Sequence, residues 1–440
     1  MMKALDIVAR LRALGDDRRG AVLIVTAVTV PVLVGFAGIG VEVGMWYNAK
    51  RDLQTAADAA ALSGAFERIR GNPAGLQDAA RFEAERNGFV TASPNTIAVN
   101  NPPTSGSKAG EQSAVEVILT QDHRLLLASL FMNQSVTVAA RAVAAVDTTG
   151  EACVLALHPT AGAALNNQGS SIVNMTGCVM ASNSTATNAI VVSGSSTVTA
   201  FSLWTAGGTS VDGSANLTIE RPSTINAWQL DDPWADLTIP PYTCCTLSNL
   251  TMNGPKTIGP ATPTGVYSIK GRVKLTSSDV LTLKPGTYII DSGNLELMAG
   301  STLRCECPNP EDGVTIMLTS STSASQIGVF NIAGGANVDL RAPSDGSNPF
   351  RGVLFYQDRR ANETTSAAHK FNGDSSMKLQ GAIYIPKQGI EFKGNTAGAQ
   401  TCTQIVALTV SFTGNSHLDN SGCKDAGVEP VTVTQARLAE

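Results

Sequence analysis

An uncharged apolar run at residues 21–41 constrains this chain more than any other feature. About 20 apolar residues in a helix cross the hydrocarbon core of a bilayer. A cleaved signal peptide has a shorter apolar core of about 7–15 residues. The small residues Gly35, Ala37, Gly38 and Gly40 leave cleavage open as an alternative, and a buried core helix is another. Because a helix that is apolar on every face at this length favours lipid, we predict an uncleaved transmembrane anchor at 21–41.

Basic residues set the predicted orientation of this anchor. Five precede the run, whereas the first ones after it are Lys50 and Arg51, further out; the five are Lys3, Arg10, Arg12, Arg18 and Arg19. The larger cluster of Lys and Arg marks the cytoplasmic side. Trp46 and Tyr47 stand where an interfacial aromatic belt is expected. We therefore predict that residues 1–20 are cytoplasmic and that the rest of the chain, beyond the span, is exported.

The next hundred residues predict a small α+β unit at 42–147. Residues 45–84 are rich in alanine, a strong helix former, and Gly71-Asn72-Pro73 interrupts them. A second helix over 74–87 should end at Gly88. Two strands are expected, at 114–119 and 136–143.

Motifs within this region resemble those of TadG-type proteins, which belong to the Flp pilus (tight adherence) assembly systems of bacteria. They run from residue 18 to about 146 and include a basic motif before the span, a proline inside it, an acidic exit and an Ala-rich helix. In this sequence they are Arg18-Arg19-Gly20-Ala21, Pro31, Glu42-Val43-Gly44, Leu53-Gln54 and Ala56-Ala57-Asp58-Ala59-Ala60-Ala61-Leu62. The resemblance implies a bacterial inner-membrane protein associated with pilus biogenesis.

Many relatives in this family carry a von Willebrand A-like domain with an Asp-x-Ser-x-Ser metal motif, and this sequence departs from that pattern. Asp291-Ser292-Gly293 has glycine where the first serine belongs. Asp374-Ser375-Ser376-Met377-Lys378 ends in lysine. The family's metal site is therefore not carried over, and we predict no metal and no cofactor.

The region 148–425 has a different texture, with short β-rich runs and a recurring glycine motif. Each copy has a glycine followed by a strand-like segment, at Gly169, Gly194, Gly213, Gly300, Gly335, Gly373 and Gly414. Steps of about 20–40 residues are typical of solenoid coils. We predict a right-handed parallel β-helix, in which each coil buries its inner face on the next, with a β-sandwich as the alternative. Pro-rich residues 221–265 should form a long excursion, and residues 426–440 a disordered tail.

The eight cysteines suit an oxidising compartment. They are Cys153, Cys178, Cys244, Cys245, Cys305, Cys307, Cys402 and Cys423. We expect Cys153–Cys178 and Cys402–Cys423 to fasten the two ends of the solenoid, and Cys244/Cys245 to pair with Cys305/Cys307. A zinc site is disfavoured because Cys-x-x-Cys is absent from the sequence and its four histidines, His123, His158, His369 and His417, are scattered.

Each residue suited to catalysis also suits a structural role. Asp231-Asp232 is the one adjacent carboxylate pair considered for polysaccharide cleavage, which needs two carboxylates, but Pro233 indicates a solvated turn. Asp358-Arg359-Arg360 reads as an exposed turn, and His369, next to Lys370, as a surface histidine. Asp58 and Ser63 on the Ala-rich helix suit packing or solvent.

The sequence therefore predicts a protein without enzymatic activity: a membrane-anchored component of Flp pilus assembly with a structural or adhesive β-helix. The expected partners are the membrane and other pilus-assembly proteins, pilin or a surface glycan. A net charge of −5 gives no basic surface, so nucleic acid is excluded. The alternative is a membrane-anchored β-helix that binds or degrades polysaccharide.

Overall fold

The computed structural model describes residues 18–126, 128–130, 135–252, 254–373, 377–394, 402–419, 422–423, 425–429 and 431–440. They divide into two compact units, and each is described by itself. Unit 1 comprises Met1–Thr148 and Thr434–Glu440, and unit 2 comprises Thr149–Val433.

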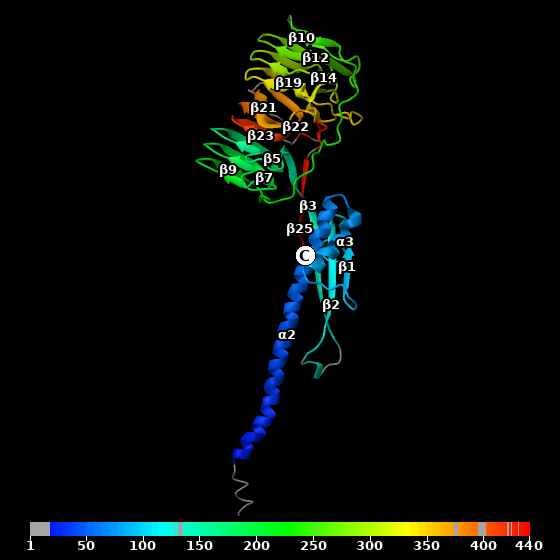
Figure 1. Cartoon of the computed structure of the whole chain (residues 1–440), viewed down its shortest axis with the longest axis vertical. Helices are drawn as coiled ribbons and strands as arrows, with labels where there is room; N and C mark the ends of the chain where they lie inside the picture. The colour runs from blue at the N-terminus through cyan, green and yellow to red at the C-terminus, as the bar shows by residue number, and fades with distance from the viewer. Residues whose placement is uncertain are drawn as a thin grey trace, which may run out of the picture. The chain divides into compact units, whose positions relative to one another are not determined.

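Unit 1 contains a long helix, α2 (Arg18–Ile69), which includes the predicted span (Figure 1). Within the described part of the chain, it is the single helix that is long and apolar enough to cross a membrane. Two threonines in the apolar stretch hide their hydroxyls, because Thr26 and Thr29 donate to the carbonyls of Val22 and Val25 at 2.7 and 2.8 Å. Such bonds lower the cost of a polar side chain in an apolar environment.

The rest of unit 1 packs against the second half of α2. The elements are η1 (Pro73–Gly75), α3 (Leu76–Arg86), β1 (Thr96–Asn100), β2 (Ala114–His123), η2 (Ala128–Leu130) and the first part of β3 (Val136–Ala156). β1, β2 and β3 form an antiparallel sheet. Alanines on α2, among them Ala57, Ala60 and Ala65, are fully buried in the core against sheet residues such as Val115. Their small side chains let the backbones of helix and sheet approach closely.

The end of the chain differs from the prediction. Residues 426–440 were expected to form a disordered tail, but Val431–Leu438 is strand β25. Backbone bonds join Glu440 and Ala439 to Val143 of β3, with Val143 N–H donating to Glu440 at 2.9 Å. Ala436 enters the core of unit 1. Unit 2 is thus a long insertion in the sequence of unit 1.

The described residues of unit 2 form strands and one short helix, η3 (Ala324–Gln326). The first strands after β3 are β4 (Leu165–Asn167), β5 (Ile172–Ser182), β6 (Ile190–Val192), β7 (Thr197–Thr205), β8 (Thr209–Val211) and β9 (Asn216–Ile219). After the excursion come β10 (Leu247–Leu250), β11 (Lys256–Ile258), β12 (Val266–Leu275), β13 (Val280–Leu283), β14 (Gly286–Asp291), β15 (Leu295–Leu297), β16 (Thr302–Cys305) and β17 (Val314–Thr319). The last are β18 (Phe330–Ile332), β19 (Asn337–Arg341), β20 (Val353–Gln357), β21 (Thr364–Gly373), β22 (Lys378–Gly394), β23 (Thr403–Phe412) and β24 (Ser416–Asp419).

Strands of unit 2 stack in parallel layers. Every pairing between the described strands of unit 2 is parallel, for example β14 with β17 and β5 with β7. Because a β-sandwich is built from antiparallel sheets, that alternative is wrong. The described pairings run in three lines, and successive strands of one line come from successive turns of the chain.

The order of the layers is not the order of the sequence. One line of paired strands runs β10, β12, β14, β17, β20, β22, β23, β3, β5, β7. The chain therefore enters unit 2 at β3, in the middle of the stack, and builds toward β9. It then crosses to the opposite end, restarts at β10 and builds back until β23 pairs with β3.

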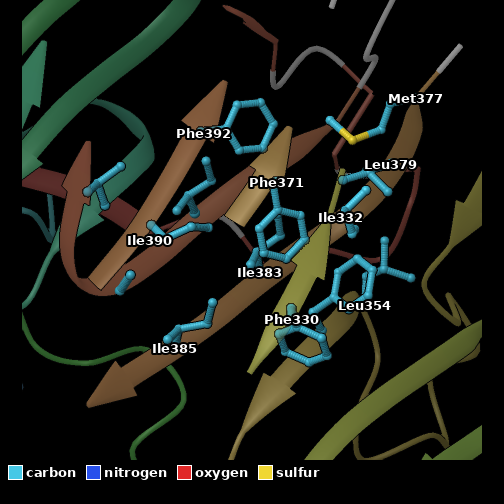
Figure 2. Packing of buried hydrophobic residues seen from close by; sticks show 14 of the residues in the cluster. Phe330, Ile332, Leu354, Phe371, Met377, Leu379, Ile383, Ile385, Ile390 and Phe392 are labelled. Carbon is cyan, nitrogen blue, oxygen red and sulfur yellow. The ribbon is translucent and has the colours of Figure 1, made fainter. Parts of the chain in front are cut away.

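The interior of the stack is a continuous apolar core (Figure 2). Phe330, Phe371 and Phe392 come from successive layers and are buried. Their ring centroids lie 6.0 and 6.3 Å apart. Phe355 fits beside Phe330 at 4.9 Å in an edge-on arrangement, one that aromatic pairs favour.

The recurring glycines turn the chain at most of the positions that the sequence predicts, although Gly373 is the last residue of strand β21. Those in the left-handed region, with φ between 73° and 81°, are Gly169, Gly194, Gly213, Gly300 and Gly335. Glycine adopts this conformation without steric cost. At Gly194 a Cβ atom would also lie 2.7 Å from the carbonyl oxygen of Gly169 in the adjacent layer, so the stacking itself requires glycine.

The Pro-rich excursion is a packed strap. Residues 221–245 cover an apolar column on the outer face of the stack. The column follows the strand register through Ile289, Met317, Tyr356, Tyr384, Val406, Leu155, Ala181 and Trp204. From the strap, Trp234 is buried and contributes to this second core. Its ring meets Tyr384 edge-on at 5.5 Å.

Candidate functional site

The first candidate site lies at the end of the apolar run, where Glu42 is the first charged residue of α2 after the span. Glu42 is 3% exposed. Its carboxylate accepts the backbone N–H groups of Leu126 and Ala128 at 2.8 and 2.6 Å. These two residues belong to the turn between β2 and β3, so Glu42 holds that turn against α2. A charged acceptor makes stronger hydrogen bonds than a neutral one.

A cavity of about 310 Å³ adjoins this clamp. Its lining includes Glu42, Trp46, Asp52, His123 and Arg124. Nε2 of His123 is buried and has no hydrogen-bond partner within the described part of the chain. Sequence reasoning named Glu42 only as a family motif, since the partner turn lies more than eighty residues away.

A second polar cluster lies on the face of the unit 1 sheet that points away from α2. Glu116 is fully buried on β2 and accepts bonds from Thr104, Asn100 and the Arg141 guanidinium. Burial would raise the pKa of Glu116, but these hydrogen bonds outweigh it and lower the pKa to about 2. Arg141 also bonds to Glu440, whose pKa Ser107 and Arg141 lower to about 2. On α2, Asp58 accepts from Gln54 at 2.8 Å, and Ser63 donates to Ala79 at 3.3 Å, so both have structural roles.

In unit 2, the two aspartates considered for catalysis, Asp231 and Asp232, are not arranged as an acid–base pair. Asp231 is exposed, while Asp232 accepts from Tyr384 at 2.8 Å and pairs with Arg359 at 3.0 Å. Burial, and then the charge of Asp232, raise the pKa of Tyr384. Asp232 therefore fastens the strap to the stack.

The Asp358-Arg359-Arg360 segment is more buried than the expected exposed turn. Asp358 is 5% exposed and pairs with Arg360 at 2.6 Å. Hydrogen bonds from Arg360 and Thr319 overcome burial and lower the pKa of Asp358. Arg359 donates to the carbonyl of Trp234 in the strap.

The expectation of a surface histidine at His369 is wrong. His369 is completely buried in the stack. Its Nδ1 accepts the N–H of Phe330 at 3.1 Å, and its Nε2 lies 3.0 Å from Oε1 of Gln388. Burial lowers the pKa of His369 to about 3, so the ring is neutral. His369 shares its face of β21 with the buried Phe371, two residues further on, so the alternation of this strand was the signal that could have placed it.

The eight cysteines form four pairs: Cys153–Cys178, Cys244–Cys245, Cys305–Cys307 and Cys402–Cys423. The expected location of two pairs differs from the structure. Cys153 and Cys178 link β3 to β5, and Cys402 directly precedes β23, so these pairs lie in the middle of the stack. The expected pairing of Cys244/Cys245 with Cys305/Cys307 is also not seen, since each cysteine bonds within its own short segment.

Residues near the incomplete metal motifs have other partners. Asp291 is fully buried and pairs with Lys270 at 3.4 Å. Hydrogen bonds from Ser321 and Ser292 outweigh burial and lower the pKa of Asp291 to about 2. Cys244 and Cys245 lie near this carboxylate, but their sulfurs are bonded to each other, and metals bind thiolates. The motif at 374–376 lies outside the described residues.

Comparison with known proteins bears on the membrane-anchored segment. Residues 20–67 match the family model described as "Putative Flp pilus-assembly TadE/G-like". The resemblance read from the sequence is thereby confirmed over this segment, which covers most of α2 and includes Glu42. A comparison with curated proteins returns no significant match.

Among solved structures, the chain matches a competence-associated pilin, ComZ, from Thermus thermophilus. The identity is 12% and the TM-score 0.22, over 87% of this chain and 98% of that one. At this score the likeness carries no conclusion about fold or function.

Proposed function

We propose that the chain is a single-pass envelope protein of Flp (tight adherence) pilus assembly, with its N-terminus in the cytoplasm. The observation that carries this proposal is the match of residues 20–67 to the TadE/G-like family, on a helix whose first half is apolar and exposed. The basic residues before the span support the orientation. Unit 2 would then stand outside the cytoplasm.

Reporter fusions test the orientation. Alkaline phosphatase, which folds only after export, should be active when fused after Glu440 and inactive when fused before Met1. The reverse pattern would contradict the proposed topology. The mass of the mature protein tests the anchor itself, since a chain shortened by the first forty or so residues would mean that the span is cleaved.

We propose further that unit 2 is a right-handed parallel β-helix that serves as a rigid structural or adhesive module. Support comes from its parallel layers, its turn glycines and its continuous core. Other pilus-assembly proteins or pilin are the proposed partners, with a surface glycan as a further one. Deleting the gene should reduce pilus production or surface attachment. A variant with residues 149–433 replaced by a short linker should fail to restore them if unit 2 is the acting module.

A role without catalysis is part of the same proposal. It is supported by Asp232, which is engaged by Tyr384 and Arg359, while its neighbour Asp231 is solvent-exposed. The purified protein should release no sugar from pectin, alginate or cell-wall glycans. Turnover that disappears in Asp231→Asn or Asp232→Asn would favour the polysaccharide-degrading alternative.

We also propose that all eight cysteines are oxidised in the exported protein. The four pairs seen in the structure support this. Mass spectrometry after alkylation should find no free thiol without a reducing agent and eight afterwards. Eight alkylated thiols in the native protein would contradict both oxidation and export.

A further inference from the structure

The turn between β2 and β3 lies beside α2 at the point where the apolar run ends (Figure 1). The run at 21–41 corresponds to about 30 Å of helix, which matches the hydrocarbon thickness of a bilayer. Glu42 follows it directly and binds the N–H groups of Leu126 and Ala128. If the run spans the bilayer, the turn is therefore fixed at the depth of the lipid interface.

The composition of the turn suits that depth. The described residues of the turn, 125–126, 128–130 and 135, contain no charged side chain. Leu126 is 59% exposed although it is large and apolar. The carboxylate of Glu42, which would be costly to bury in lipid without partners, has both oxygens engaged by N–H groups.

Cationic and aromatic groups lie next to this apolar tip. Arg124 is exposed, and it lines the cavity beside Trp46 and His123. Tryptophan and arginine are common at lipid interfaces, where the guanidinium reaches phosphates and the indole lies at the headgroups. Asp52, which also lines the cavity, stands ten residues beyond Glu42, about 15 Å further along the helix and so outside the phosphate layer.

We propose that the β2–β3 turn is a second membrane contact: Leu126 enters the outer-side lipid interface, Arg124 faces phospholipid phosphates, and Glu42 holds the turn at this depth. The inference rests on the proposed anchorage of α2. Its consequence is that unit 1 meets the bilayer at two places, through α2 and through the turn. A contact at two places restricts rotation of unit 1 about α2, which a single helix leaves free.

Depth-dependent quenching tests the contact in the full-length protein. A fluorescent amino acid is introduced by codon suppression at one position at a time, which leaves the cysteines untouched. The protein is reconstituted in vesicles of phosphatidylethanolamine and phosphatidylglycerol, with or without bromine on the acyl chains. Position 126 is compared with position 33 in the span and position 82 on α3, where Leu33 and Phe82 are 67% and 62% exposed.

Bromolipid should remove at least half of the emission at positions 126 and 33 and leave position 82 unchanged. Position 82 lies on the helix that packs against Ser63, roughly 30 Å beyond Glu42 along α2. Quenching at 33 without quenching at 126 would overturn the second contact and leave the anchorage standing. If neither position were quenched, the anchorage would fail and the second contact with it.

The role of Glu42 is tested by Glu42→Ala with the fluorophore at 126. Quenching at 126 should fall at least twofold, while quenching at 33 stays the same. Asp52→Ala is the matched control, because Asp52 lies on the same helix but makes no described bond to the turn. Unchanged quenching at 126 in Glu42→Ala would show that Glu42 does not hold the turn.

Discussion

Unit 1 and unit 2 bury their interiors in different ways. Unit 1 packs small alanines of α2 against a sheet and buries a carboxylate, Glu116, among hydrogen-bond donors. Unit 2 fills its stack with large side chains such as Phe330 and Phe371, and buries a neutral imidazole, His369. Unit 2 buries carboxylates as well, so the difference lies in the size of the core side chains and in the buried imidazole, and the two units should respond differently to loss of core volume and to acid.

The largest expected effect comes from removing volume in unit 2. Phe371→Ala should lower the free energy of unfolding of unit 2 by about 3–5 kcal/mol, since the stacked layers cannot collapse to fill the space. Phe82→Ala, at an exposed phenylalanine of unit 1, is the matched control and should change stability by less than about 0.5 kcal/mol. Denaturant titration followed by hydrogen exchange and mass spectrometry resolves the two units. Equal losses of stability in Phe371→Ala and Phe82→Ala would mean that the apolar core does not stabilise unit 2.

A smaller effect is expected from the charge cluster of unit 1. Arg141→Met keeps the aliphatic stem but leaves the buried Glu116 with one partner fewer, which should cost about 2–3 kcal/mol. Arg86→Met is the control, because Arg86 is 70% exposed and its pair with Glu83 should contribute less than about 0.5 kcal/mol. Peptides of unit 1 should exchange faster in Arg141→Met, and those of unit 2 should not. Protection that is unchanged in unit 1 would make the cluster dispensable.

The smallest expected effect is that of acid, which should lower the stability of unit 2 and leave that of unit 1 unchanged. The pKa of His369 is lowered to about 3, so the unfolded chain takes up a proton near its ordinary pKa of 6.5 and the folded stack does not. Unit 2 should thus lose about 2 kcal/mol between pH 7 and pH 5. Glu116 and Glu440 have pKa values lowered to about 2, so their contribution is complete above about pH 4.5 and is lost only as the pH falls toward 2.

Hydrogen exchange at pH 7 and pH 5, corrected for intrinsic rates, measures this difference. Unit 2 should lose protection over this interval and unit 1 should keep it. In His369→Asn, whose amide oxygen can still accept the N–H of Phe330, the loss in unit 2 should disappear. A loss that persists in this variant would assign the acid sensitivity to another group.

Local signals in the sequence predicted local structure well. The apolar run and its basic flank gave the first half of α2, and Gly71-Asn72-Pro73 gave its end. Glycines such as Gly194 and Gly213 marked turns because only a residue without a side chain fits both the φ angle and the adjacent layer. In each case the physical cause lies within a few residues of the signal.

What the sequence did not predict depends on distant partners. The pairing of β23 with β3 joins Ile405 to Val154. Because the layers resemble one another in sequence, no local feature showed that the chain enters the stack in its middle. The same holds for Glu42 and its turn, for the buried His369, and for the strap, which its prolines predicted only as an excursion although its own Trp234 is buried. The pairs Cys153–Cys178 and Cys402–Cys423 were predicted at the ends of the stack for the same reason, because the order of the layers was not known.

The insertion of unit 2 between β3 and β25 has a consequence for biosynthesis. Arg141 meets Glu440 across 299 positions, and Ser107 meets it across 333. Because the chain is synthesised from its N-terminal end, α2 and β1–β3 emerge from the ribosome long before their last partner. Unit 1 can complete its charge cluster only once the whole of 149–433 has been synthesised. Completion of unit 1 thus reports that the chain of unit 2 has been synthesised in full, and a chain arrested midway would leave Arg141 without its second carboxylate.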